Sequence, residues 1–358
     1  MSGTRTGLVT RRTAPLADAP AVRTGRVGIA ISAVVVLLVA ITAGVSAGAA
    51  DISFTDVVAS VLSHVGIGET PLPPAKDAIV WQLRMPRVLT GAAVGAGLGL
   101  CGAIVQAVTR NALADPYLLG LSSGASLGAA VVILLGAAIA LPVAAFLGAS
   151  LALLTTIGLA GLAGRGTGST NRTILAGIAV SSLFAAGTSL LVFWSATGDT
   201  YREILGWLLG TLGGANWTTT VTAAVAFVVV GLPLCAGATT LDAFAFGETA
   251  ARGLGVNVSA VRWVLLGGCA LLTGALVSIS GSIGFVGLVV PHAVRLLVGN
   301  GHRAVLPLSA LFGSIMIVVA DATARTAFAP RELPVGVLTA LVGAPVFAIL
   351  LVRSRRRA

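Results

Sequence analysis

The sequence has few charged residues. Of its 358 residues, 9% are charged and 56% are hydrophobic, and the mean hydropathy is +1.02. A soluble domain usually carries about 25% charged residues, so this composition excludes a soluble fold. It also excludes a disordered chain, because such chains are polar and rich in charge. Apolar runs of about 20 residues predict membrane helices, and they lack the alternation of outer-membrane β-barrels.

Lysine is almost absent, and this excludes one kind of nucleotide site. A Walker A loop needs the pattern Gly-x-x-x-x-Gly-Lys-Ser/Thr to hold phosphates. The only lysine, Lys76, follows Pro74 and Ala75 and cannot belong to such a loop. If the protein works with ATP, we therefore expect another chain to hydrolyse it.

The sequence also lacks the side chains that catalysis or ion coupling would need. Three histidines, His64, His292 and His302, are scattered and form no His-Glu-x-x-His motif, which disfavours a membrane enzyme. A secondary transporter usually needs carboxylates in mid-membrane, and the predicted spans have none except near their ends. The cysteines show neither a disulfide framework nor metal-ligand spacing, and we interpret them as packing residues: Cys101, Cys235 and Cys269.

The predicted fold is all-α, a polytopic membrane protein of about ten transmembrane helices. A basic tail (1–27) precedes the membrane domain (28–352), and a second basic tail (353–358) follows it. The first apolar segment is too long for a signal peptide and no Ala-x-Ala site ends it, so we interpret it as a retained helix. The predicted spans are 28–50, 88–108, 117–136, 142–163, 173–196, 217–237, 260–281, 283–299, 304–324 and 334–352.

The distribution of basic residues predicts the orientation. With the N-terminus in the cytoplasm, 16 of the 22 basic residues fall in cytoplasmic segments and 6 in external ones. This bias favours both termini inside. The net charge of +10 is therefore an orientation signal, and we expect no nucleic-acid partner.

External arginines run against this bias and need a reason. Arg84 and Arg87 precede the second span, and Arg325 lies at the other external end near Asp321 and Glu332. One interpretation is headgroup contact or local ion pairs. The other is a docking surface for an acidic partner, since guanidinium groups pair bidentately with carboxylates.

Glycine is abundant within the spans. Gly91, Gly95 and Gly99 share one helical face, which predicts close helix packing. Segments 110–126 and 281–292 combine glycine, proline and serine, as broken helices that line a passage do. In the long cytoplasmic linker 238–259, residues 247–252 are predicted to form a short helix that Gly253 and Gly255 end.

Eight motifs occur in the order found in the FecCD family, and the chain resembles these permeases over about residues 28–352. The motifs are Arg84-Met-Pro-Arg87, Arg110-Asn-Ala-Leu-Ala-Asp-Pro-Tyr-Leu-Leu-Gly120, Ser122-Ser-Gly-Ala-Ser126, Leu175-Ala-Gly-Ile-Ala179, Trp207-Leu-Leu-Gly210, Gly247-Glu-Thr-Ala-Ala-Arg-Gly-Leu-Gly255, Gly284-Phe-Val-Gly-Leu-Val-Val-Pro-His292 and Glu332-Leu-Pro-Val-Gly336. Two positions depart from the family pattern, with Ala112 where proline is common and Met85 where leucine is common.

The resemblance implies a type II ABC importer permease in the plasma (inner) membrane. Such a permease works as a dimer, expected here to consist of identical chains, on two cytoplasmic ATPases that use the ATP; it is expected to bind no cofactor or metal itself. A substrate-loaded external binding protein would dock through glutamates on Arg84, Arg87 and Arg325. The ATPase-coupling segment would include Gly247, Glu248, Arg252, Gly253 and Gly255. The cytoplasmic gate would include Asn111, Leu113, and Thr170 and Asn171 in the loop 169–171.

The family imports iron–siderophores, haem and cobalamin by alternating access. Ferric siderophores are its commonest cargo, so the resemblance favours them, with haem and cobalamin as alternatives. A passage for so large a cargo fits the absence of charge within the spans.

Overall fold

The computed structural model describes residues 20–48, 50–136, 140–162, 169–194, 198–245, 247–253, 255, 257–328 and 331–355. No strand occurs in these ranges, so the predicted all-α fold is confirmed. Most of the predicted tail 1–27 and the end of the tail 353–358 lie outside them. In the first half of the chain the helices are α1 (Pro20–Ser46), α2 (Phe54–His64), α3 (Pro74–Ala78), the π-helix η1 (Ile79–Arg84), α4 (Met85–Thr109), the 3₁₀ turn η2 (Pro116–Leu119), α5 (Leu121–Leu135), α6 (Leu141–Leu162) and α7 (Ser169–Trp194).

The second half of the chain is equally helical. Its elements are α8 (Gly198–Leu208), α9 (Trp217–Ala226), the π-helix η3 (Phe227–Gly231), α10 (Leu232–Cys235), α11 (Ala238–Ala245), α12 (Glu248–Gly253), α13 (Val258–Ser280), α14 (Val286–Val298), α15 (His302–Thr326) and α16 (Val335–Arg355). Seven helical stretches of the described residues are long and apolar enough to cross a membrane, and three shorter apolar helices lie at 121–135, 286–298 and 335–349. Together they coincide with the ten predicted spans. The sequence did not predict the short helices α2, α3, α8 and α11.

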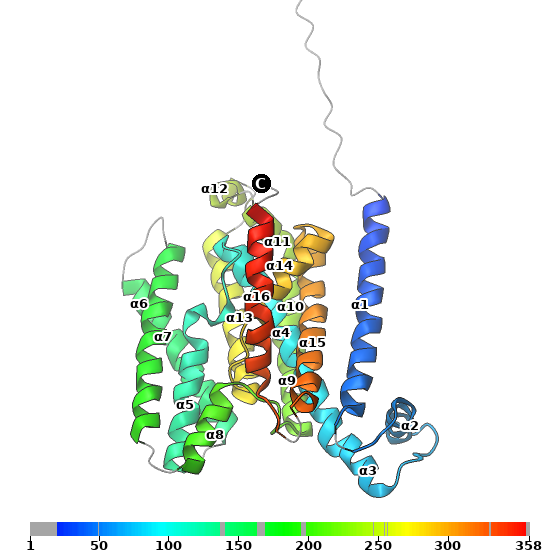
Figure 1. The fold of residues 1–358 in the computed structure, drawn as a ribbon. Helices are drawn as coiled ribbons and strands as arrows, with labels where there is room; N and C mark the ends of the chain where they lie inside the picture. The colour runs from blue at the N-terminus through cyan, green and yellow to red at the C-terminus, as the bar shows by residue number, and fades with distance from the viewer. Residues whose placement is uncertain are drawn as a thin grey trace, which may run out of the picture.

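Both described ends of the chain lie on the same side of the bundle. In Figure 1 the start of α1, the end of α16 and the short helix α12 are at the top, whereas α2, α3 and α8 are at the bottom. This arrangement agrees with the predicted topology, in which the termini and the 247–255 segment share the cytoplasmic side. We call the opposite side, where α4 begins and α15 ends, the outer side.

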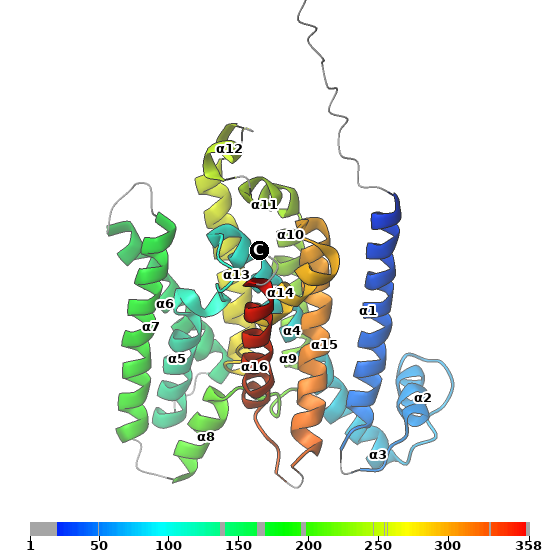
Figure 2. The ribbon, with the colours of Figure 1, turned by 45° about the horizontal axis from the view of Figure 1, so that its top comes forward.

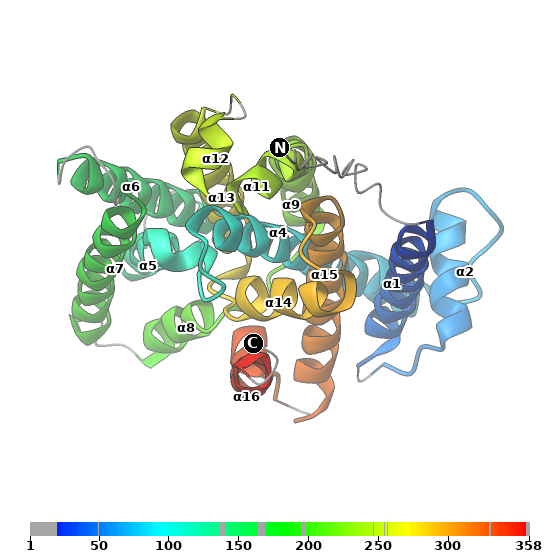
Figure 3. The ribbon, with the colours of Figure 1, turned by 90° about the horizontal axis from the view of Figure 1, so that it is seen from above.

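Helix α4 is the centre of the bundle. Figure 3 shows it surrounded by α13, α14 and α15, with α6 and α7 at one far end and α1 and α2 at the other. Of the most apolar window in residues 74–109, 83% is buried, against 11% for the window of α1. Figure 2 shows α1 beside α15 at the edge of the bundle, with α2 and α3 next to its outer half. The core therefore gathers around α4, and α1 is attached at its edge.

Glycine lets α4 and α15 touch backbone to backbone. A Cβ atom on Gly95 would lie 2.2 Å from the carbonyl oxygen of Gly313, and one on Gly99 would lie 2.2 Å from that of Ser309. No larger residue fits either position without moving a helix. The predicted packing role of the glycine face is thus confirmed, and it works as expected for helices in lipid.

Residues 281–285, between α13 and α14, form an irregular segment within the bundle. Its ends adopt left-handed conformations, with φ of +66° at Gly281 and +68° at Phe285. The Tyr117 hydroxyl donates to the carbonyl of Ile283 (2.9 Å) and accepts from its N–H (3.2 Å). These bonds satisfy backbone groups that lipid could not. The predicted helix break is therefore present, and Tyr117 supplies hydrogen bonds to part of its backbone.

Candidate functional site

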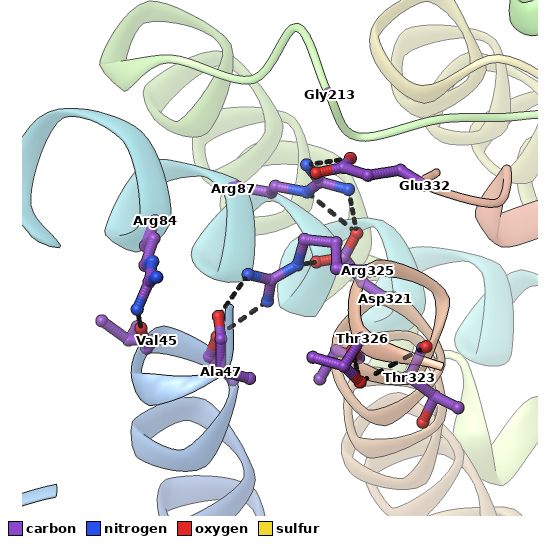
Figure 4. Close-up of polar contacts among 12 residues, drawn as sticks. Val45, Ala47, Arg84, Arg87, Gly213, Asp321, Thr323, Arg325, Thr326 and Glu332 are labelled. Carbon is purple, nitrogen blue, oxygen red and sulfur yellow. Dashed lines mark hydrogen bonds and ion pairs between the residues drawn. The ribbon is translucent and has the colours of Figure 1, made fainter. Parts of the chain in front are cut away.

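The structure gathers Arg84, Arg87 and Arg325 at the outer ends of α1, α4 and α15, and we call these residues with Asp321 and Glu332 the outer cluster (Figure 4). Arg84 ends η1, next to the outer end of α1. Its Nη1 donates to the carbonyls of Val45 (2.9 Å) and Ser46 (2.8 Å). Because the final carbonyls of a helix have no partner within it, a cation there is stabilising. Arg84 is only 8% exposed, so its guanidinium group interacts with the end of α1 and is largely hidden from solvent.

Arg325 serves the same helix end from α15. Its Nη1 and Nη2 donate to the carbonyls of Ala47 (3.0 Å) and Gly44 (2.7 Å). Its Nε donates to Oδ2 of Asp321 at 3.0 Å, one helical turn earlier. Its side chain is 6% exposed. Two arginines thus hold the outer end of a helix that is otherwise poorly buried.

Arg87 bridges two carboxylates of different exposure. Its Nη2 lies 2.9 Å from Oδ1 of Asp321, and its Nη1 lies 2.8 Å from Oε2 of Glu332. The side chain of Asp321 is 1% exposed and that of Glu332 is 54% exposed. Figure 4 shows Arg87 between the two carboxylates, with Asp321 shared with Arg325.

The outer cluster brings the three predicted arginines together but turns them inward. The local ion pairs that the sequence left open are present, as Arg87 and Arg325 both pair with Asp321. The binding of Arg84 and Arg325 to carbonyls at the end of α1 was missed, because a backbone acceptor leaves no mark in a sequence. Docking of a partner on these arginines stays a prediction.

The predicted coupling segment forms a short helix on the cytoplasmic side. Gly247 (φ +96°) and Gly255 (φ +81°) flank α12, whose Ala251 packs against Phe244 and Val258. Arg252 and Gly253 are exposed, whereas the side chain of Glu248 lies outside the described residues. The short helix is confirmed, and its role in coupling stays a prediction.

A contact between α11 and α15 supports this region. Asp242, on α11 just before the coupling segment, accepts the backbone N–H of His302 (3.0 Å), and its Oδ1 lies 2.7 Å from Nδ1 of the same residue. Asp242 thereby caps α15 from another helix. Nothing in the local sequence indicates this pairing, because the two residues are 60 positions apart.

The predicted gate residues fall into two groups. Asn111 follows Arg110, which ends α4 in a left-handed conformation, and its Oδ1 accepts the N–H of Leu113 at 2.9 Å. Leu113 is 49% exposed in this turn. Residues 169–171 were expected to be a loop, but they form the first turn of α7, as suits the helix-starting residues Ser, Thr and Asn. The side chains of Thr170 and Asn171 lie outside the described residues, and the gating role of all four stays a prediction.

Two open clefts run along α7 and share Tyr117 and Ser181 in their linings. The first has a volume of about 430 Å³, and seven of its nine described lining residues carry hydroxyl groups. Ser122, Ser123 and Ser126 line it from α5, as the serine-rich segment suggested, and α7 adds hydroxyls that the sequence did not single out: Ser181, Thr188 and Ser189. The second cleft, of about 420 Å³, extends along the irregular segment past Gly284 and Phe285. In the described part of the chain, no three His, Cys, Asp or Glu residues are placed to hold a metal ion.

Comparison with known proteins defines the class. The profile of the FecCD transport family matches residues 36–353, and the chain belongs to this family. It is a multi-pass membrane protein and an ABC importer permease, a transport subunit rather than an enzyme.

Relatives of this chain cover most of its length. An uncharacterized ABC transporter permease of Bacillus subtilis is 39% identical over 89% of this chain and 92% of its own length. The cobalamin import permease of Halobacterium salinarum is 44% identical over 78% of this chain and 75% of its own. A metal-chelate type ABC transporter solved in an inward-facing conformation is 32% identical, with a TM-score of 0.77, covering 91% of this chain and 99% of that one.

Proposed function

We propose that this permease imports a metal chelate, and that cobalamin is the cargo to test first. The support from relatives is direct, because permeases that are 44% and 41% identical carry the names of cobalamin or vitamin B12 importers. Ferric siderophores, which the family resemblance favours, are the second candidate. The name of the metal-chelate type neighbour is compatible with either cargo.

The hydroxyl-lined cleft is the observation that carries this proposal. Seven hydroxyl groups in an open cleft of a membrane-spanning chain favour contact with water or a polar cargo over contact with lipid. The described lining of this cleft has no charged residue. Cobalamin, with its many amide groups, would exchange hydrogen bonds with such a wall without requiring a charge partner.

We further propose a full importer around this chain. Two copies would enclose the passage, because the clefts of a single copy are open. Each copy would engage a cytoplasmic ATPase through α12, and ATP would be used there and not by the permease. A loaded binding protein would dock on the outer cluster and deliver the cargo, and alternating access would follow ATP binding.

The cargo test uses the complete importer reconstituted in liposomes with its own ATPase and binding protein. Uptake of labelled cyanocobalamin and of a labelled ferric hydroxamate siderophore is measured with and without ATP inside the liposomes. We expect ATP-dependent uptake of cobalamin. ATP-dependent uptake of the siderophore alone would replace the first candidate by the second, and uptake of neither would refute both.

Deletion of residues 247–252 tests the coupling proposal separately. Removal of these residues, which form most of α12, should abolish co-purification of the ATPase, because α12 lies on the cytoplasmic side with Arg252 exposed. The matched control deletes residues 65–68 in the outer loop after α2, which should leave the ATPase bound. Intact co-purification after deletion of α12 would refute the coupling role.

A further inference from the structure

Glu332 differs from every other described partner of the three arginines. Arg84 donates to backbone carbonyls, those of Val45 and Ser46 at the end of α1 and that of Ala50 just after it. Arg325 adds Asp321, which is 1% exposed and enclosed between two guanidinium groups. Glu332 alone is a side chain that is 54% exposed, on the segment between α15 and α16.

This difference decides which contacts can be exchanged. The carbonyls around Arg84 and Arg325 cannot leave unless α1 itself moves. Asp321 cannot leave without stranding two buried cations, which is strongly unfavourable. Glu332 can swing into water at small cost, since measured exposed ion pairs contribute little.

We propose that Glu332 is an internal substitute for a carboxylate of the docking protein. In the free permease it occupies Nη1 of Arg87, at 2.8 Å. An acidic side chain of the arriving binding protein takes this position and releases Glu332, while Arg87 keeps its contacts with Asp321. This inference rests on the proposed docking at the outer cluster and adds to it that the site is occupied until docking.

The exchange is chemically balanced. One carboxylate replaces another on the same guanidinium, so the number of charge-assisted hydrogen bonds to Arg87 is unchanged. The partner gains no new cation at this position, and its binding is weakened by the need to displace Glu332. Nη1 of Arg87 therefore has a carboxylate acceptor both before and after the exchange.

Release of Glu332 would allow the start of α16 to move against the irregular segment, residues 281–285. Leu333 donates its N–H to the carbonyl of Ala324 (3.1 Å), and α16 starts two residues later. On α16, a Cβ atom at Gly336 would lie 2.1 Å from the carbonyl oxygen of Leu209 and 2.9 Å from that of Ser282. The released residue is therefore only four positions from a tight contact with the segment that borders the clefts.

The test measures binding of the loaded binding protein to the intact importer in nanodiscs, by biolayer interferometry. Glu332→Gln and Glu332→Ala should each tighten binding by about two- to fivefold, the worth of one exposed ion pair. Glu69→Gln is the matched control, because Glu69 is an exposed glutamate on the outer side, between α2 and α3, and is not a member of the outer cluster. It reports the general effect of removing one negative charge from this face.

Several outcomes separate this exchange from docking itself. Unchanged or weaker binding of both Glu332 variants, or a gain no larger than that of Glu69→Gln, would overturn the exchange. If Arg87→Gln weakens binding while both Glu332 variants behave like wild type, docking stands and the exchange fails. If the wild type does not bind, both fail. In the Arg87→Gln background, we expect Glu332→Gln to give no gain, because its partner is gone.

Discussion

Replacement of Asp321 by asparagine removes the charge at the centre of the outer cluster. Asp321 accepts from Nε and Nη2 of Arg87 at 3.0 and 2.9 Å, and from Nε of Arg325 at 3.0 Å. Asparagine keeps one acceptor oxygen but directs an amide N–H at a guanidinium group. Loss of one partner from a buried ion pair costs about 3–5 kcal/mol, so we expect Asp321→Asn to lower the free energy of unfolding by about that amount.

Thermal unfolding in one detergent, followed by tryptophan fluorescence, measures this effect. The midpoint of Asp321→Asn should fall by several degrees, and the outer end of α1 should become more accessible to protease because Arg325 loses its anchor. Asp199→Asn is the control, since that carboxylate is fully exposed and its arginine, Arg202, is 3.9 Å away. An Asp321→Asn protein that unfolds with the midpoint of wild type would refute a stabilising role for the buried network.

Two further variants probe the packing of the bundle. Gly95→Ala should destabilise the protein by about 1–3 kcal/mol or more, because the new methyl group meets a backbone carbonyl, whereas Gly158→Ala, with nothing within 4 Å, should be neutral or slightly stabilising in the same unfolding assay. Equal midpoints for the two variants would contradict the close contact of α4 and α15. Tyr117→Phe should cost about 1–3 kcal/mol and speed hydrogen exchange at Ile283, whose N–H loses its acceptor. Unchanged exchange there would show that another group satisfies this backbone.

The membrane helices could be predicted from sequence because their signal is local. Each span is a continuous apolar run of sufficient length, and the glycine face of α4 is visible at positions 91, 95 and 99. The helices α2, α3, α8 and α11 were missed, because they are short segments that no long apolar run marks.

The outer cluster was predicted in its members but not in its orientation. An arginine on the external side of a membrane protein looks exposed when only charge statistics are considered. The burial of Arg84 depends on backbone oxygens near residue 45, 39 positions away, which carry no side-chain signature. The clefts were half predicted for a similar reason, since Ser122 and Ser126 belong to a conspicuous motif around Gly124, whereas Ser181 and Ser189 lie within an ordinary apolar helix.

The backbone contact between α4 and α15 has a mechanical consequence. At Gly95 and Gly99 no side chain separates the two helices, so neither can slide along the other by even one residue without a collision of main-chain atoms. The two helices therefore move together as one unit about 37 Å long, the length of 25 helical residues. One end of this unit carries His302 and its bond to Asp242, and the other carries Asp321 and Arg325. A displacement of α15 at either end therefore moves α4 with it.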